Sequence, residues 1–299
     1  MPTKQPKTPT QTLAKARNLK ISELIHALKQ VYPPVLTDEL GTPTYADKTK
    51  LPSRTLCRGV VVALDVDDKV IDFMLKHECN LLITHHLLHW HTKADEKLLE
   101  PHKQSLDQLL RSHRLYTFGL HEEFDEAPQN DTSTLIARKV LHTLGVPGDL
   151  VNYYQLSPYP AILRTDQKIP LISVVNALKE VFGAGAFQAN LRPEVLNNPA
   201  NTGNYFMFMA GSGSMKYMHE FLNYSKGIVQ PDLVVTSDIK WSEWQTYRQA
   251  GLNVVAVPHN VEAVFINEMA QQVRNIISEH TTKKIPVYTF ESAPEYWNI

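Results

Sequence analysis

The sequence predicts an α/β protein made of two similar lobes with largely parallel sheets. Short, continuous runs of apolar and β-branched residues, typical of buried strands, alternate with longer segments whose apolar residues have helical spacing. This alternation occurs in both halves of the chain. A length of 299 residues is enough for two such lobes or for one large domain.

The first half opens with a helix expected over Ile21 to Val31, which ends before Pro33. Buried strands are expected at 60–64 and 81–84, and the apolar residues between them are spaced as on one face of a helix. The alternation then continues with a helix at 98–110, a strand at 115–120 and a helix at 132–144. Strands joined through helices in this way are expected to pair in parallel.

The second half repeats the pattern, with strands expected at 205–210, 233–236, 254–257 and 287–289 and helices at 241–250 and 262–279. The segment between the halves is less regular and holds one clear helix, at 171–181. These features divide the chain into a disordered tail at 1–20, an N-terminal α/β lobe at 21–150, a connecting segment at 151–204 and a C-terminal α/β lobe at 205–299.

The composition excludes several classes of protein. The 30 basic and 31 acidic residues give a net charge of −1, without the basic excess that attracts a nucleic acid or an anionic membrane. No apolar run is long enough to span a membrane, and two cysteines cannot form a disulfide framework or a Cys-rich zinc site. We expect a small-molecule substrate as the partner and the cytoplasm as the location.

The first twenty residues contain five lysines and arginines but no acidic residue, since the first acidic residue is Glu23. Such a segment resembles either a mitochondrial transit peptide or a disordered polar tail. Pro2, Pro6 and Pro9 interrupt any early amphipathic helix and favour the disordered tail.

Three predicted strands end in potential metal ligands: His85 with His86, His121 with Asp125, and His259 with Glu262. In open α/β sheets, the carboxyl ends of the strands are where ligands and reactive groups gather. Imidazole and carboxylate without sulfur suit Fe, Mn, Co, Ni or Zn. In a two-ion site carboxylates bridge, water is activated at one ion, and the pair clamps the attacked group.

The segments around these residues resemble the Nif-three-like family, also named the GTP cyclohydrolase 1 type 2 family. The first match consists of the segment Val61–Asp65 followed along the chain by Leu82–His86. The further matches, in the family's order, are His121–Pro128, Asn130-Asp131, Ala210–Ser214, Thr236–Lys240 and Gly251–Val255. The resemblance covers roughly Ile21 to Arg274.

The resemblance implies a two-lobed α/β fold, a dinuclear metal site between the lobes and assembly into a toroidal hexamer. Carried over by position, the metal ligands are His85, His86, Asp125 as a bridge, His259 and Glu262. His121 is then a residue beside the metals that is placed for proton transfer. The expected cofactor is two divalent transition-metal ions per chain, with iron, zinc, manganese, cobalt and nickel as the candidates.

The sequence departs from the family pattern near these ligands. The family spaces its last His and Glu four residues apart, whereas Glu262 is three residues after His259 and Ala263 occupies the usual place. Leu87 replaces the proline that follows the His pair, and Ser242 stands near the place of a usual histidine. The substrate assigned to the family therefore cannot be assigned directly to this chain.

Three further features have two interpretations each. Between His121 and Asp125, Glu123 is either a general base or part of a solvated acidic turn formed with Glu122. The glycine-serine segment at 211–213 is either an anion-binding nest or a tight packing turn. The histidines at 89 and 91 either line the rim of the metal cavity or belong to a polar surface loop.

Two functions of different class follow from these residues. The first is a metal-dependent hydrolase in which activated water attacks a small heterocyclic or nucleotide-like substrate, with His121 or Glu123 moving protons. The second is a non-catalytic metal-binding protein, such as a metal chaperone or an interaction scaffold. Turnover by the metal-loaded protein distinguishes the two.

Overall fold

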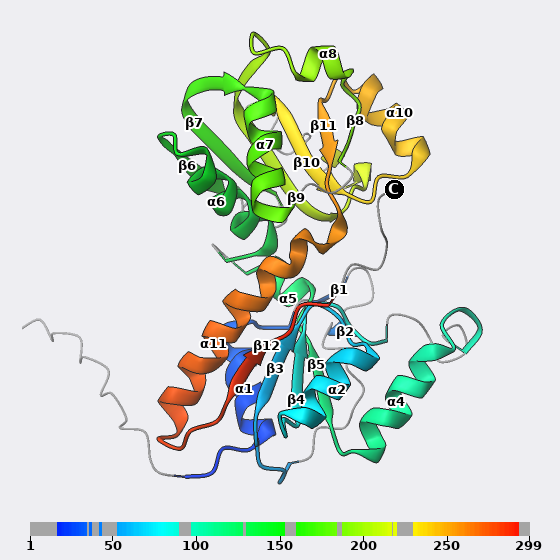
Figure 1. Cartoon of the computed structure of the whole chain (residues 1–299), viewed down its shortest axis with the longest axis vertical. Coiled ribbons are helices and arrows are strands. Elements are labelled where there is room, and N and C mark those ends of the chain that lie inside the picture. Colours follow the sequence, from blue (N-terminus) through cyan, green and yellow to red (C-terminus); the bar gives the residue numbers. More distant parts are fainter. Residues whose placement is uncertain are drawn as a thin grey trace, which may run out of the picture.

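Two main sheets, each flanked by helices, form two lobes that lie one above the other in the computed structural model (Figure 1). The structure describes residues 17–34, 36–37, 42–43, 53–89, 97–127, 130–152, 160–183, 187–216, 218–219 and 230–292. Strands β1 (Leu36–Thr37) and β2 (Thr42–Pro43) add a small two-stranded ribbon. The α/β class expected from the alternating pattern is confirmed.

The first sheet is parallel throughout and has the strand order β12-β3-β4-β5. Its strands are β3 (Val60–Ala63), β4 (Leu81–Thr84), β5 (Tyr116–Gly119) and β12 (Val287–Thr289). Alternate side chains of β3 enter different cores: Val60 and Val62 face one core, and Val61 and Ala63 face another. This burial on both faces explains why the strands are continuously apolar.

Helices on both faces of the first sheet complete its cores. Its helices are α1 (Ile21–Val31), α2 (Asp68–Lys76), α4 (His102–Ser112) and α11 (Val264–His280). Apolar residues of α1 and α11, such as Leu24 and Phe265, join the core of Val60, whereas Val70 of α2 and Leu110 of α4 join the core of Val61. The result is a three-layer α/β/α lobe.

The second sheet is mixed rather than largely parallel, which corrects the prediction for this lobe. Its order is β6-β7-β9-β10-β11-β8. The strands are β6 (Gly148–Asn152), β7 (Ala161–Pro170), β8 (Gln188–Ala189), β9 (Thr202–Ser212), β10 (Leu233–Ser237) and β11 (Val254–Ala256). Only β9, β10 and β11 run parallel, because β6 and β7 pair antiparallel with a short connection between them and β8 adds an antiparallel edge.

Helices also cover both faces of the second sheet (Figure 1). They are α6 (Thr132–Leu144), α7 (Leu171–Phe182), α8 (Pro193–Leu196) and α10 (Trp241–Gln249). Residues of α6 and α7, such as Val140 and Val174, share a core with Phe206 and Phe208 of β9. Tyr247 of α10 packs with residues of the opposite face. No helix within the described ranges combines the length and the apolar character needed to cross a membrane.

The sheets divide the chain differently from the expected ranges. The last strand, β12, pairs with β3 of the first sheet, although it was expected in the C-terminal lobe. The connecting segment supplies β7, β8 and α7 to the second sheet, and α6 packs there as well. Position along the chain misled the prediction because α11 carries the chain back to the first lobe.

Residues 19 and 20, expected to lie in the disordered tail, are part of the fold. Leu19 is 1% exposed and packs in the core, and Lys20 forms an isolated bridge with Leu56. Residues 1–16, on which the transit-peptide interpretation depends, lie outside the described residues.

Both cysteines are expected to resist thiol reagents in the native protein. Cys57 and Cys79 are buried and free, and burial raises the pKa of Cys57 to about 12 and that of Cys79 to about 11. With Ellman's reagent at pH 8, we expect no thiol to react in the native state and both to react in urea. Rapid reaction of either thiol in the native state would contradict this packing.

Candidate metal centre

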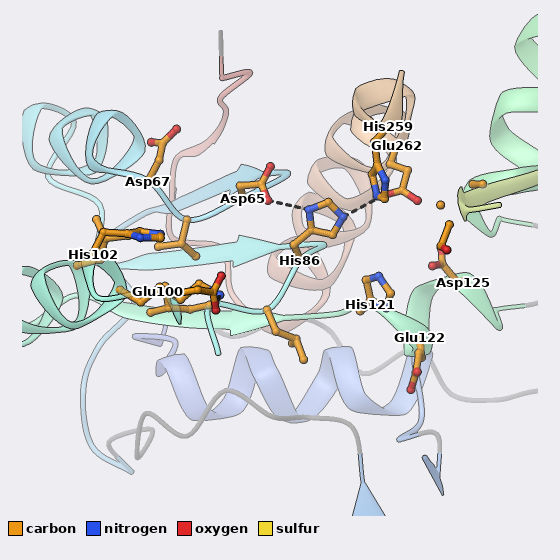
Figure 2. Close-up of a pocket in the computed structure, with 18 of the residues that line it drawn as sticks. Asp65, Asp67, His86, Glu100, His102, His121, Glu122, Asp125, His259 and Glu262 are labelled. Carbon is orange, nitrogen blue, oxygen red and sulfur yellow. Dashed lines mark hydrogen bonds and ion pairs between the residues drawn. The ribbon is translucent and has the colours of Figure 1, made fainter. Parts of the chain in front are cut away.

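The parallel strands β3, β4 and β5 end side by side, and each end carries a polar residue of the site (Figure 2). Asp65, His85, His86 and His121 all lie within two residues of these strand ends. His85 turns inward, where its ring centroid lies 5.1 Å from that of Phe265, whereas His86 lines a pocket. The strand ends therefore bring the expected histidines to one edge of the sheet.

His259 and Glu262 belong to a 3₁₀ turn, η2 (His259–Ala263), which connects β11 to α11. A 3₁₀ helix has three residues per turn, so side chains three positions apart lie on the same side. His259 Nε2 lies 2.9 Å from Glu262 Oε2 as a result. The 3₁₀ turn therefore explains how a His and a Glu only three residues apart, instead of the family's four, can lie together. Helix α11 begins at Val264 rather than at the expected Glu262.

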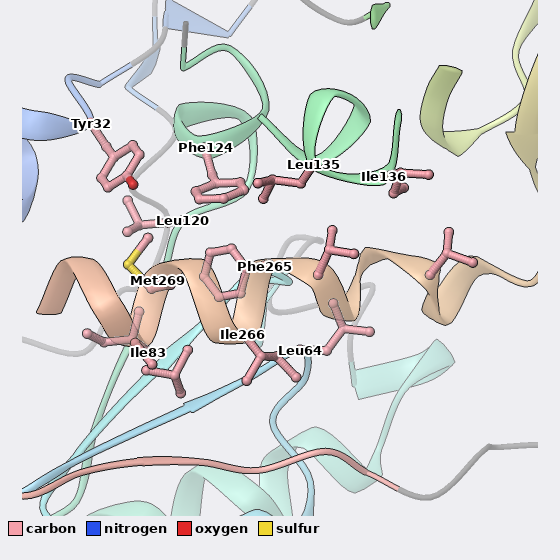
Figure 3. Packing of buried hydrophobic residues seen from close by; sticks show 14 of the residues in the cluster. Tyr32, Leu64, Ile83, Leu120, Phe124, Leu135, Ile136, Phe265, Ile266 and Met269 are labelled. Carbon is pink, nitrogen blue, oxygen red and sulfur yellow. The ribbon is translucent and has the colours of Figure 1, made fainter. Parts of the chain in front are cut away.

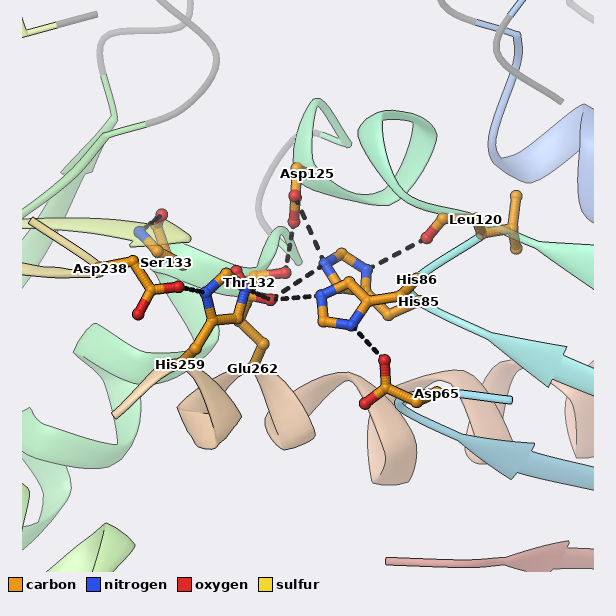
Figure 4. Close-up of polar contacts among 11 residues, drawn as sticks. Asp65, His85, His86, Leu120, Asp125, Thr132, Ser133, Asp238, His259 and Glu262 are labelled. Carbon is orange, nitrogen blue, oxygen red and sulfur yellow. Dashed lines mark hydrogen bonds and ion pairs between the residues drawn. The ribbon is translucent and has the colours of Figure 1, made fainter. Parts of the chain in front are cut away.

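One carboxylate oxygen of Glu262 is the meeting point of three imidazoles (Figure 4). Glu262 Oε2 lies 2.9 Å from His86 Nε2, 2.9 Å from His259 Nε2 and 3.7 Å from His85 Nε2. The Glu262 side chain is almost fully buried. The residue with the unusual spacing is thus at the centre of the cluster.

The Nδ1 atom of each of these imidazoles faces an acceptor elsewhere in the protein. His85 Nδ1 donates to the Leu120 carbonyl at 3.2 Å, and His86 Nδ1 donates to Asp65 Oδ1 at 2.7 Å. His259 Nδ1 donates to Asp238. Metal-binding histidines are typically held in this way, because the second ring nitrogen fixes the tautomer and the orientation of the ligand atom.

Asp125 lies on the other side of His85. Its Oδ2 atom is 3.5 Å from His85 Nε2, and its Oδ1 atom accepts a hydrogen bond from the hydroxyl of Thr132. Asp125 belongs to the short helix α5 (Glu122–Asp125), which follows β5, and Thr132 is the first residue of α6. Two helices from different lobes thus position this carboxylate.

The donor set fits divalent transition-metal ions. The possible ligand atoms form two groups, and within each group they lie within 4.8 Å of one another. One group consists of His85, His86 and His121, and the other of His86, His259 and Glu262. His85 Nε2 is fully buried and makes no hydrogen bond, although it faces two carboxylates. A buried imidazole nitrogen of this kind is a candidate metal ligand. Because His86 belongs to both groups, the two groups lie side by side.

The charges within the cluster divide its histidines into two kinds. Burial lowers the pKa of His86 and His259, but carboxylates outweigh it: Asp65 and Glu262 raise the pKa of His86 to about 10, and Glu262 and Asp238 raise that of His259 to about 9. Burial lowers the pKa of His85 and of His121 to about 4. His86 and His259 are therefore cationic at neutral pH, and the other two are neutral.

The two carboxylates shift in opposite directions. Burial alone raises the pKa of Glu262, but hydrogen bonds from His259 and His86 hold the pKa well below its ordinary value. Burial raises the pKa of Asp125 to about 7, against the opposing charge of His121. Protonated ligands of this kind release their protons when a metal ion binds in their place.

A pocket of about 1060 Å³ opens beside the cluster and is lined by residues of both lobes (Figure 2). From the second sheet, the end of β9 contributes Gly211 and Ser212, and the first lobe contributes residues of α2 and α4. His86, His121 and Glu262 are among the residues that line this pocket. The geometry therefore places the cluster of candidate metal ligands beside a cavity that can hold a small molecule.

A model of the family Duf34/NIF3 (NGG1p interacting factor 3) matches residues 19–294. The chain belongs to the Duf34/NIF3 family. Two curated relatives are named GTP cyclohydrolase 1 type 2 homolog. The relative from Mycoplasmopsis pulmonis is 25% identical over 247 residues, which are 82% of this chain and 88% of that protein. The relative from Ureaplasma parvum is 22% identical over 255 residues, 85% of this chain and 89% of that protein.

Solved structures show the same fold as this Duf34/NIF3 protein. A hypothetical protein from Staphylococcus aureus aligns with a TM-score of 0.69 at 16% identity and covers 95% of this chain and 100% of its own. Reduced HcgD from Methanocaldococcus jannaschii aligns with a TM-score of 0.63 at 15% identity, covering 92% and 99%. The family resemblance read from the motifs is confirmed, and the two-lobed architecture is common to these proteins.

The two glutamates expected between His121 and Asp125 lie in different surroundings in this family member. Glu123 is 2% exposed and does not line the pocket, whereas Glu122 does. Glu122, rather than the expected Glu123, is therefore the glutamate that lines the pocket. His89 is also not among the residues that line the pocket, and position 91 lies outside the described residues.

Sequence reasoning missed three residues that hold the ligands of this Duf34/NIF3 site: Asp65, Asp238 and Thr132. Asp65 stands at a strand end, so the rule that identified the histidines would also have identified it. Asp238 follows β10 with a φ of 44°, a left-handed conformation that its sequence does not signal. Thr132 reads only as an ordinary helix-start residue.

Replacing Asp65 with asparagine is expected to weaken metal binding about 10- to 100-fold without unfolding the protein, because a neutral amide then replaces the charged acceptor that orients the His86 ring and raises its basicity. Titration against a chromophoric chelator measures the affinity. Asp72→Asn, an exposed change on the neighbouring helix, is the matched control. An affinity within twofold of the wild type would contradict the assigned role of Asp65.

The metal-free Duf34/NIF3 protein is expected to lose stability as the pH rises. The pKa of His86 is about 10 in the folded state against an ordinary 6.5, so its stabilising contribution is complete below pH 6.5 and is lost as the pH rises through 10. The loss amounts to at most about 1.4 kcal/mol per pH unit. Urea unfolding between pH 6.5 and 10 in the presence of a chelator should show a shallower decline for His86→Ala, and equal slopes would be inconsistent with this assignment.

Proposed function

We propose that this chain is a metal-dependent hydrolase that holds two divalent transition-metal ions and attacks a small heterocyclic substrate with water. The observation that supports it most directly is the convergence of three imidazole Nε2 atoms on Glu262, with each Nδ1 atom held by an acceptor. The relatives named GTP cyclohydrolase 1 type 2 homolog support the hydrolase class.

Five residues would hold the ions: His85, His86, Asp125, His259 and Glu262. When bound, such ions polarise the attacked group and lower the pKa of a coordinated water. Glu262 lies between the imidazoles of both groups, and Asp125 faces His85 from the opposite side, so these carboxylates are the candidate bridges. Acceptors for all three Nδ1 atoms keep the ligands in place before an ion arrives.

His121 is the residue we assign to proton transfer. It lines the pocket, and its ring centroid lies 4.7 Å from that of His85. Because burial lowers its pKa to about 4, the imidazole is neutral at neutral pH, and one of its ring nitrogens carries no proton. Glu122 lines the same part of the pocket and is the second candidate, in the role that was expected of Glu123.

The test is a comparison of turnover by metal-loaded wild type and by His85→Ala across a panel of heterocycles and nucleosides. Anaerobic purification keeps an oxidisable metal in place. We expect at least one compound to be hydrolysed more than about 100-fold faster by the wild type, in line with loss of a metal ligand. Exchangeable metal without turnover above the variant would instead assign the chain to non-catalytic metal handling.

A further inference from the structure

The pocket beside the proposed metal centre offers three positions where a phosphate group would ordinarily bind. They are the N-terminus of α2, the Lys103 ammonium group and the glycine-serine turn at 211–213. Each lies in the lining of the pocket. At the first two a carboxylate of the protein already occupies the position of the anion, and at the third a carboxylate lies beside the turn.

At the N-terminus of α2, the anion position is filled by the helix's own acidic residues. Asp67 Oδ1 accepts a hydrogen bond from the amide of Val70 at 2.6 Å, and Asp67 Oδ2 accepts one from the hydroxyl of Ser292 at 2.8 Å. Asp68 adds a second carboxylate, which accepts from the amide of Lys69 at 3.0 Å. The helix dipole thus stabilises these carboxylates and would not attract a further anion.

Lys103 is the only lysine, and there is no arginine, among the described residues that line the pocket. Its Nζ atom forms an ion pair with Glu100 Oε2 at 2.9 Å, and its side chain is only 12% exposed. The charge of Lys103 is therefore neutralised at short range before any ligand enters.

The glycine-serine turn faces a carboxylate as well. Gly211 has a φ of +80°, and a Cβ atom added there would lie 3.0 Å from Glu262 Oε1. A Cβ atom on Gly213 would lie 2.6 Å from the carbonyl oxygen of Ser237. The glycines are thus required by close packing, which decides between the two interpretations of this segment in favour of the packing turn.

We propose that this pocket selects an uncharged or cationic substrate and discriminates against phosphorylated ones, nucleoside triphosphates included. Seven carboxylates and one lysine line it among the described residues. Two bound divalent ions would bring four positive charges and Lys103 a fifth, which are still fewer than the negative charges of the seven carboxylates. This selectivity rests on the proposed function, because it concerns the substrate of the same metal centre.

The test uses the protein loaded with Co²⁺, whose visible absorption reports on ligands that reach the metal. Inorganic phosphate is the anionic probe, and acetohydroxamic acid, uncharged in solution, is the matched probe. The double variant Asp68→Asn/Glu100→Gln removes one carboxylate at α2 and frees Lys103, while Glu279→Gln, an exposed change on α11, is the control.

We expect the double variant to bind phosphate about fivefold or more tightly than the wild type and the control do, with the affinity for acetohydroxamic acid unchanged. Phosphate affinity that is unchanged or weaker in the double variant would overturn the proposal, as would an absence of phosphate binding in all three proteins. If the wild type takes up no Co²⁺, the proposed function itself fails, which is a different result from either of these.

Discussion

Replacing Glu262 with glutamine is expected to lower the affinity for divalent transition metals by more than about 100-fold, the upper end of what the loss of a supporting residue costs. Glu262 Oε2 is the atom on which His85, His86 and His259 converge. The amide has nearly the same size, but it removes the negative charge and cannot bridge two cations. Metal content after dialysis, measured by plasma mass spectrometry, should fall to near the background.

The matched control for this change is Glu279→Gln, which removes the same charge from an exposed position on α11. It should retain the metal content of the wild type. Metal content in Glu262→Gln equal to that of this control would show that Glu262 is not a ligand. Circular dichroism of both variants separates loss of a ligand from loss of the fold.

Replacing Phe265 with alanine is expected to destabilise the protein by about 3–5 kcal/mol, the usual cost of emptying a buried aromatic position. Phe265 is 0% exposed, and its ring centroid lies 4.8 Å from that of Phe124 of α5 and 5.1 Å from that of His85 (Figure 3). The same ring therefore packs the core and supports the back of the metal cluster.

Urea unfolding of the metal-free protein measures this cost. Leu75→Ala, at a position on α2 that is 37% exposed, is the control and should cost less than about 1 kcal/mol. A loss below about 1.5 kcal/mol for Phe265→Ala would mean that the core around Phe124 closes over the gap. We also expect the Phe265→Ala protein to bind metal more weakly, since His85 loses a wall of its site.

The sequence was sufficient to predict three of the four strands of the first sheet, β3, β4 and β5, and the positions of their ends. Continuous apolar runs at β3, β4 and β5 have one explanation, a sheet buried on both faces, and parallel pairing then brings His85, His86 and His121 to one edge. The second lobe was harder, because β7 begins with buried residues and continues with mostly exposed ones, and because β6 and β7 lie in a segment of mixed composition. The antiparallel pairing of β6 with β7 is local, but the pairing of β7 with β9 joins strands that α7 separates along the chain.

The site shows a similar division. His259 and Glu262 could be proposed from their positions, but their spacing became intelligible only with the 3₁₀ turn, which periodicity cannot distinguish from the start of α11. The acceptors of the Nδ1 atoms were missed for a different reason. Asp238 reaches His259 from the end of another strand, and no local pattern links two residues 21 positions apart.

The most direct test of the central claim is anomalous X-ray diffraction from crystals of the metal-loaded protein, recorded on both sides of the absorption edge. We predict two peaks about 3.5–4 Å apart, one beside His85 and Asp125 and the other beside His86 and His259, with Glu262 next to both. A single peak would contradict the dinuclear centre. Full occupancy of metal at other positions, with none among these residues, would contradict the metal centre altogether.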